Sequence, residues 1–158
     1  MQPEIIIRKL QHSDIQSCMT LFHDTVHTIN FDDYTQSQLD SWATHEMNMA
    51  DWMPLLSNIT YVAEYNHVIV GFADMTPQGH LDHLYVHKDF QRKGIASALV
   101  KKLEEEARNR NVWEMASEFS LTAKPMAEKL GFKLIEQCIK EHREEKFIVF
   151  VMKKQLMP

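Results

Sequence analysis

Residues 83–99 read HLYVHKDFQRKGIASAL, and this stretch decides the fold of the 158-residue chain. It begins as a strand, continues as a short loop with two cations, and reaches a glycine at the first turn of an amphipathic helix. A helix N-terminus has unpaired amides and the positive end of the helix dipole. Gly94 and the small Ala96 leave room for a phosphate at these amides, beside Arg92 and Lys93. The stretch therefore predicts an anion site suited to a pyrophosphate.

Two better-known nucleotide motifs do not occur in the sequence. The P-loop pattern GxxxxGK[ST] is absent, and no GxGxxG follows a strand. The alternative interpretation is an ordinary strand-to-helix connection with a solvated basic loop, because a single glycine at a helix start is common. The local chemistry alone leaves both interpretations open.

Hydrophobic periodicity predicts elements in the order β-α-α-β-β-β-α-β-α-β-β, which is one mixed α/β domain over residues 1–158. The predicted strands cover residues 4–10, 59–65, 68–75, 80–87, 112–118, 132–140 and 146–152. The predicted helices cover residues 15–26, 35–49, 95–109 and 122–131.

Local signals add detail to two of these helices. Ser13 and Gln16 have capping-box spacing at the start of the first helix. Thr122 is expected to cap the last helix, and Gly131 to end it. In the segment 35–49 we expect Leu39, Trp42 and Met49 to face inward.

Composition and charge exclude several classes of protein. The chain has 17 Lys and Arg against 22 Asp and Glu, a net charge of −5, which argues against a broad nucleic-acid surface. No apolar run reaches the roughly 20 residues of a membrane span, and residues 1–7 lack the basic start of a signal peptide. Cys18 and Cys138 form no metal or disulfide pattern. We therefore expect a soluble cytoplasmic protein with reduced thiols, bound neither to nucleic acid nor to a membrane.

Three motifs together resemble the Gcn5-related N-acetyltransferase (GNAT) superfamily. Residues 91–96, QRKGIA, match the family signature Q/R-x-x-G-x-G/A, and residues 84–90 resemble the strand end that precedes it. Residues 127–132, AEKLGF, resemble the family's YEKLGF junction, with Ala127 in the place of the tyrosine. The resemblance covers about residues 5–153 in element order, and in motif detail about 80–99 and 120–132.

The resemblance implies a fold and a co-substrate. The expected fold is a single GNAT-like α/β domain whose mixed, mostly antiparallel sheet has a splayed central strand pair and flanking helices. The co-substrate is acetyl-CoA, with its pantetheine arm on the splayed strand, its pyrophosphate on the helix amides, and the segment 120–124 on its other side. A backbone amide near Val86 is the expected partner of the thioester carbonyl. The implied binding residues are Leu84, Tyr85, Val86, Gln91, Arg92, Lys93, Gly94, Ile95, Ala96, Ser97, Ser120 and Lys124.

The family's usual chemistry is direct attack of a free amine on the thioester, which requires removal of a proton from the ammonium. His80 stands where some relatives place a basic carboxylate, and an imidazole suits proton transfer near neutrality. Asp82 shares its strand face, and Glu118 ends the next strand, so both are further candidates. Because Ala127 replaces the tyrosine, the thiolate is protonated by another hydroxyl or by water, or it leaves unaided.

The histidines near the signature motif also raise the question of a metal site. His80 and Asp82 face one side of the predicted strand, whereas His83 and His87 face the other, so they cannot converge on one ion and we expect no metal. The resemblance implies a small-molecule or peptide amine as acceptor, and a homodimer is common in the family. Two alternatives remain: a non-catalytic acyl-CoA-binding module of the same fold, or a small interaction protein that binds no nucleotide.

Overall fold

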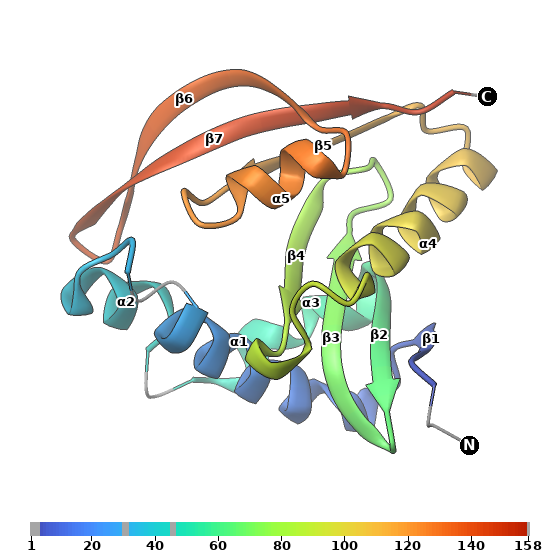
Figure 1. Ribbon diagram of the computed structural model, residues 1–158, viewed down its shortest axis with the longest axis horizontal. Helices are drawn as coiled ribbons and strands as arrows, with labels where there is room; N and C mark the ends of the chain where they lie inside the picture. Colours follow the sequence, from blue (N-terminus) through green and yellow to red (C-terminus); the bar gives the residue numbers. More distant parts are fainter. Residues whose placement is uncertain (1–3, 30–31, 45–46, 158) are drawn as a thin grey trace.

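The structure, a computed structural model, describes residues 4–29, 32–44 and 47–157 (Figure 1). Its strands are β1 (Ile6–Lys9), β2 (Ile59–Tyr65), β3 (Val68–Met75), β4 (Leu81–Val86), β5 (Glu114–Phe119), β6 (Lys133–His142) and β7 (Glu145–Gln155). Its α-helices are α1 (Ile15–Ile29), α2 (Gln36–Trp42), α3 (Pro54–Ser57), α4 (Ile95–Asn109) and α5 (Lys124–Lys129). Three short 3₁₀ helices are η1 (His12–Asp14), η2 (Met49–Trp52) and η3 (Lys88–Phe90). No helix in the described ranges has both the length and the apolar character that crossing a bilayer would require.

The strands form two antiparallel sheets that meet along β4 and β5. The first sheet has the order β1-β2-β3-β4, and the second has the order β5-β7-β6. A single parallel bridge, between His80 and Ala116, joins the two sheets just before β4 begins. The expected mixed, mostly antiparallel sheet with a splayed central pair is therefore confirmed.

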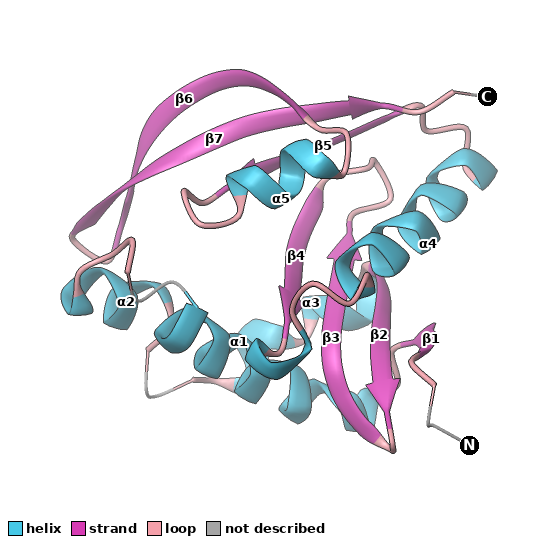
Figure 2. Cartoon of the chain, in the orientation of Figure 1, coloured by secondary structure: helices cyan, strands magenta, loops and turns pink. Residues whose placement is uncertain are grey.

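Helices cover both faces of the first sheet (Figure 2). Alternate residues of a strand face opposite sides of the sheet, so β2 and β3 contribute to two apolar cores. Val62 and Phe72 pack with α1 and α2 in one core, while Ala63 and Ala73 pack with α4 in the other. The sheet is thus fixed from both sides, which holds the end of β4 in a defined place.

Most predicted elements are confirmed, and β2 and β3 have the predicted bounds. Asn66 and His67 form the tight turn between them, with φ angles of 51° and 65°. The apolar stripe of the first helix is also confirmed, because every member is at most 8% exposed. These members are Ile15, Cys18, Met19, Phe22 and Val26.

The helix predicted over residues 35–49 is wrong in its length. Thr35 caps α2, so the helix begins close to the predicted position, but α2 ends at Trp42 because Ala43 adopts an extended backbone conformation. Leu39 is fully buried, whereas Met49 lies in η2 and is 39% exposed, which corrects its inward placement. Residues 45–46 of this segment, like residues 1–3 at the N-terminus, lie outside the described ranges.

Two predicted caps are also wrong. Instead of Ser13 with Gln16, the backbone N–H of Gln11 donates to the Asp14 carboxylate at 2.7 Å, two residues earlier, at the start of η1. The N-cap residue of α5 is Ala123, with no side-chain cap, and the Thr122 hydroxyl donates to Asp33 at 2.6 Å instead. In both cases a partner distant in sequence, or a competing acceptor, overrides the local pattern.

Candidate active site

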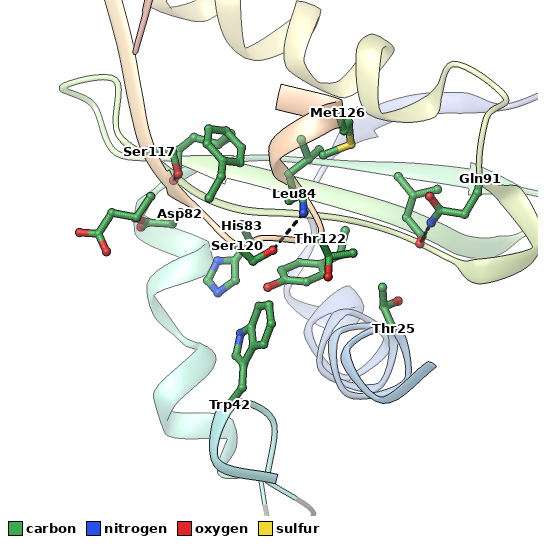
Figure 3. Close-up of a pocket in the computed structure, with 16 residues that line it drawn as sticks. Thr25, Trp42, Asp82, His83, Leu84, Gln91, Ser117, Ser120, Thr122 and Met126 are labelled. Carbon is green, nitrogen blue, oxygen red and sulfur yellow. Dashed lines mark hydrogen bonds between the residues drawn. The ribbon is translucent and has the colours of Figure 1, made fainter. Parts of the chain in front are cut away.

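The site is built at the place where β4 and β5 separate. The Ala116 N–H donates to the Gly79 carbonyl at 3.1 Å, and the Ser117 hydroxyl donates to the Leu81 carbonyl at 2.5 Å. Beyond this point the two strands belong to different sheets and pair with other neighbours. Their separation leaves a pocket of about 170 Å³ between them (Figure 3).

This first pocket collects several residues that the sequence predicted. Both strands contribute, together with α1, α2 and the start of α5. The predicted residues that line it are Asp82, Leu84, Tyr85, Val86, Gln91, Glu118 and Ser120. Thr122 and Ala123 of the predicted segment 120–124 line it as well, together with Met126 of the helix that follows. Thr25, Trp42 and His83 also line it and were not predicted as binding residues.

The start of α4 has the form expected of an anion site. Gly94 is the N-cap residue with φ +79°, a conformation that favours glycine, and no side chain caps the helix. A Cβ placed on Gly94 would meet no atom within 4 Å, so the space beside the first residue of the helix start is open. Ile95 differs from its neighbours because its side chain is 2% exposed and packs in the core, which leaves only its backbone for a ligand. Arg92, Lys93 and Ser97 are exposed beside it.

One hydrogen bond connects this loop to β4. The Gln91 side-chain amide donates to the Val86 carbonyl at 2.5 Å (Figure 3). Gln91 also lines the first pocket, whereas Arg92 to Ser97 do not. The pocket and the helix N-terminus are therefore neighbouring parts of one surface, joined at the position of Gln91.

The segment predicted to line the opposite side is only partly in place. The Ser120 hydroxyl accepts a hydrogen bond from the Ala123 N–H at 3.1 Å and faces the pocket. Lys124 does not line the pocket: its ammonium group pairs with Glu128 at 3.0 Å and lies 5.2 Å from the centre of the Phe150 ring.

A second pocket, of about 280 Å³, adjoins the first on the side of α2 and the β6–β7 hairpin. Aromatic rings form much of its wall: Tyr34 and Phe147 lie 5.5 and 6.0 Å from Trp42 between ring centres. Five residues line both pockets and so mark their junction. They are Trp42, Asp82, Tyr85, Glu118 and Ser120.

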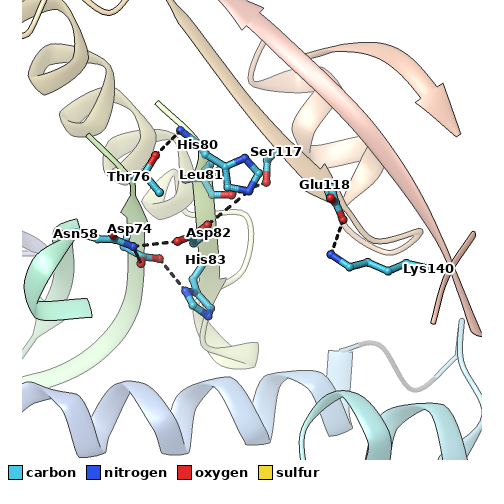
Figure 4. Close-up of polar contacts among 10 residues, drawn as sticks. All are labelled: Asn58, Asp74, Thr76, His80, Leu81, Asp82, His83, Ser117, Glu118 and Lys140. Carbon is cyan, nitrogen blue, oxygen red and sulfur yellow. Dashed lines mark hydrogen bonds and ion pairs between the residues drawn. The ribbon is translucent and has the colours of Figure 1, made fainter. Parts of the chain in front are cut away.

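The three candidate bases occupy different positions (Figure 4). Asp82 stands at the junction of the pockets. His80 lines neither pocket, but its Nε2 lies 3.4 Å from Asp82 Oδ1, which agrees with the predicted shared strand face. Glu118 faces both pockets and is paired with Lys140 at 2.9 Å. The structure therefore brings His80 and Asp82 together, whereas Glu118 pairs with Lys140 instead.

A second histidine–aspartate pair was not predicted from the sequence as a catalytic feature. His83 Nδ1 lies 2.8 Å from Asp74, which is 1% exposed. The Asn58 amide donates to Asp74 and to Asp82, each at 2.9 Å, and so connects the two pairs. Asp74 and His83 are directly opposite in the β3–β4 register, which only a known strand pairing could have revealed. Among the described residues, no group of three or more metal-ligating side chains converges on one point.

The residue in the place of the family tyrosine lies in the core. Ala127 is fully buried, so it brings no polar group to the pocket. The junction has a hydroxyl in Tyr85. Burial raises the pKa of Tyr85, and Trp42 opposes this increase only in part. Tyr85 is therefore protonated at neutral pH.

The opening between β4 and β5 offers room for an extended ligand, and the helix N-terminus beside it is suited to an anionic group of that ligand. Residues 30–156 match the family model of the acetyltransferase (GNAT) domain. The chain is 31% identical over 150 residues to the uncharacterized N-acetyltransferase YafP of Escherichia coli (strain K12), covering 94% of this chain and 95% of that protein. The chain therefore belongs to the GNAT acetyltransferase family.

Solved structures agree with this assignment. A GCN5-related N-acetyltransferase from Rhodopseudomonas palustris superposes with a TM-score of 0.91 at 25% identity, over 99% of this chain and 97% of that one. The protein yncA from Salmonella typhimurium, solved with its cofactor acetyl-CoA, superposes with a TM-score of 0.71 at 19% identity, over 97% of this chain and 94% of that one. The second likeness shows the fold alone.

Proposed function

We propose that this protein is an acetyl-CoA-dependent N-acetyltransferase that acetylates a primary amine by direct attack in a ternary complex. The observation that carries this proposal is the opening between β4 and β5, which leads to the uncapped N-terminus of α4. Membership of the GNAT family and the acetyl-CoA named for the Salmonella typhimurium neighbour support it.

The residues around the opening fit an acetyl-CoA molecule. The amides that follow Gly94 would hold the pyrophosphate, since the space above that glycine is open and cations flank it. The pantetheine arm would lie along β4, at Leu84, Tyr85 and Val86, with Ser120 opposite. Lys124 is the weakest member of the predicted set because Glu128 already neutralises it.

The two pockets suggest how the reactants are divided between them. The thioester supplies an electrophilic carbonyl in the first pocket, and a backbone amide near Val86 is its proposed hydrogen-bond partner. The acceptor would enter through the second pocket, where Asp82 and Glu118 attract an ammonium group toward the junction. His80 acts on the site through Asp82.

A second candidate function has one observation in its favour. Ala127 is fully buried in the position of the family tyrosine, so the usual proton donor is missing. A non-catalytic acyl-CoA-binding module would have the same fold and would bind acetyl-CoA without releasing the thiol. The tyrosine hydroxyl at the junction favours the enzyme instead, because it offers another proton donor.

An assay of thiol release distinguishes these two functions. Purified protein is incubated with acetyl-CoA and, in turn, with a polyamine, an aromatic amine, an amino acid and a lysine peptide, and free CoA is measured. We expect release that depends on one class of amine and stays at the background rate without it. Binding of acetyl-CoA with no amine-dependent release in any class would favour the binding module.

The expected homodimer remains a prediction. β6 is an edge strand of its sheet, and its exposed face carries large apolar side chains. Those of Ile135 and Ile139 are 59% and 71% exposed, and Ile148 of β7 is 45% exposed. A second copy of the chain would find exposed apolar surface here.

A further inference from the structure

A pair formed by a buried aspartate, Asp74, and a partly exposed histidine, His83, borders the candidate site, and the candidate bases do not include it. Asp74 of β3 is 1% exposed and accepts hydrogen bonds from Asn58 at 2.9 Å and from His83 at 2.8 Å. A carboxylate removed from water needs such donors, because burial without them would penalise its charge. These two bonds fix Asp74 and, through it, the imidazole of His83.

The bond to Asp74 leaves the other nitrogen of His83 free. A carboxylate accepts hydrogen bonds, so Nδ1 carries the proton and Nε2 keeps its lone pair. The side chain is 30% exposed and lines the first pocket. Figure 3 shows the ring beside Trp42 and Ser120, on the pocket side of β4. Within the described part of the chain, no group hydrogen-bonds to Nε2.

Aromatic rings hold the imidazole in this orientation and bring no charge to it. Four ring centres lie 5.1–6.3 Å from that of His83. They belong to Trp52, Phe72, Phe22 and Tyr85. Cys18 of α1 is neutral too, because burial raises the pKa of its thiol to about 12. Asn58 links Asp74 to Asp82, whose carboxylate lies 3.4 Å from Nε2 of His80.

We propose that Nε2 of His83, held in place by Asp74, takes the first proton from the acceptor amine. This inference rests on the proposed function, because it assigns the general base of the proposed acetyl transfer. An imidazole titrates near neutral pH, whereas a carboxylate titrates more than two units lower, so the imidazole is the better proton acceptor. Asp82 then has the separate role of attracting the ammonium group to the junction.

The proton balance of the reaction follows from this assignment. The ammonium N–H bond breaks and its proton moves to Nε2. The free amine forms a C–N bond with the carbonyl carbon as the C–S bond breaks. The Tyr85 hydroxyl gives its proton to the departing sulfur and regains one from the nitrogen, which thereby loses its second proton, and His83 returns its own to water at its exposed edge. The products are an amide, a thiol and one released proton.

The substitution His83→Asn tests the proposal most cleanly. The asparagine amide replaces the Nδ1–H donor, so Asp74 keeps its partner, but nothing replaces Nε2. With an amine found by the thiol-release assay, we expect kcat to fall about 100-fold, the lower end of general-base effects. The variant's rate should rise about tenfold per pH unit as free amine accumulates, whereas the wild-type rate should depend less steeply on pH because Nε2 already takes the proton. His12→Gln, in exposed η1 outside both pockets, is the control and should match the wild type.

Three further measurements make the result decisive. The acetyl-CoA affinity of His83→Asn should equal that of the wild type, which shows that the fold is kept. Asp74→Asn changes which nitrogen carries the proton and should lower kcat at the same affinity. A long-range ¹H–¹⁵N spectrum should show His83 protonated at Nδ1 only. The His83 proposal would be overturned if the His83→Asn variant had the same pH profile as the wild type, or if His83 were protonated at Nε2 instead of Nδ1. The proposed function would be overturned if the wild-type protein released no thiol with any amine.

Discussion

Arg8 and Asp14 form the best-defined ion pair of the N-terminal region. The two guanidinium nitrogens donate to the two carboxylate oxygens at 2.8 and 3.0 Å, and the Asp14 side chain is 10% exposed. The hydrogen bonds from Arg8, followed by the N–H of Gln11, hold the pKa of Asp14 below its ordinary value of 3.8. A lowered pKa in the folded state means that the pair stabilises the protein above about pH 4, and that this stabilisation is lost as the pH falls further.

Asp14→Asn should therefore have an effect that depends on pH. At pH 7 we expect the free energy of unfolding to fall by about 1.5–3 kcal/mol, the range for hydrogen bonds to charged groups. Below about pH 4 the unfolded wild-type chain takes up a proton at Asp14 while the folded protein, with its lowered pKa, still resists protonation, so the difference between the two proteins should shrink as the pH falls. Urea denaturation of both proteins at pH 7 and pH 3 measures this. An equal difference at the two pH values would show that the charge of Asp14 is not the cause.

For single residues, the sequence predicted the strand face on which a side chain lies better than the side chain that it contacts. The alternation of β4 correctly placed His80 and Asp82 on one face, and their 3.4 Å contact confirms it. It could not show that His83 meets Asp74, because that contact depends on the register of the β3–β4 pair and on a bulge next to it. Asn58, which joins the two pairs, has no sequence signature at all.

Two glycines with positive φ act differently on the elements they connect. Gly79 (φ +95°) lies where β4 and β5 meet, and a Cβ there would lie 2.5 Å from the Glu114 carbonyl oxygen. Gly94 (φ +79°) begins α4, and a Cβ there would meet nothing within 4 Å. The first glycine is needed for close packing, whereas the second is needed only for its backbone conformation and for access to the helix amides.

We therefore expect alanine substitutions at these two glycines to differ in their effect on stability. Gly94→Ala should lower the free energy of unfolding by about 1 kcal/mol, the strain of a positive φ. Gly79→Ala adds a clash with backbone that cannot move aside, so it should cost about 3 kcal/mol or more. Guanidinium denaturation of the two variants gives both values. Equal losses would contradict the close contact at Gly79.

The elements that could be predicted are those with a strong local pattern. The hairpin of β2 and β3 has two runs rich in β-branched and aromatic residues around a tight turn, and α4 keeps its apolar stripe over 15 residues. The segment between α1 and β2 could not be predicted, because its short helices depend on contacts with distant residues. Ser41 of α2, for example, donates to the His142 carbonyl at the far end of β6.

For the whole molecule, fold and family followed from three short motifs, but the acceptor did not. The motifs surround the co-substrate side, where β4 ends and α4 begins. The wall of the second pocket combines residues of α2, β5 and the β6–β7 hairpin with Tyr34, which lie far apart in sequence. The net charge of −5 describes the whole surface and could not locate this pocket.

The central claim is that the N-terminus of α4 binds the pyrophosphate of acetyl-CoA, and calorimetric titration tests it most directly. The wild type, Gly94→Ala and Gly94→Glu are titrated with acetyl-CoA. We predict binding in the micromolar range for the wild type, about −8 kcal/mol at 1 μM. Gly94→Ala imposes the same backbone strain and should stay within about tenfold of that affinity.

Gly94→Glu places a negative charge where the pyrophosphate is expected, so it should abolish binding while unfolding at nearly the same denaturant concentration as Gly94→Ala. That result would establish the site. Wild-type affinity in a folded Gly94→Glu protein would contradict the account, because the co-substrate would then have to bind elsewhere.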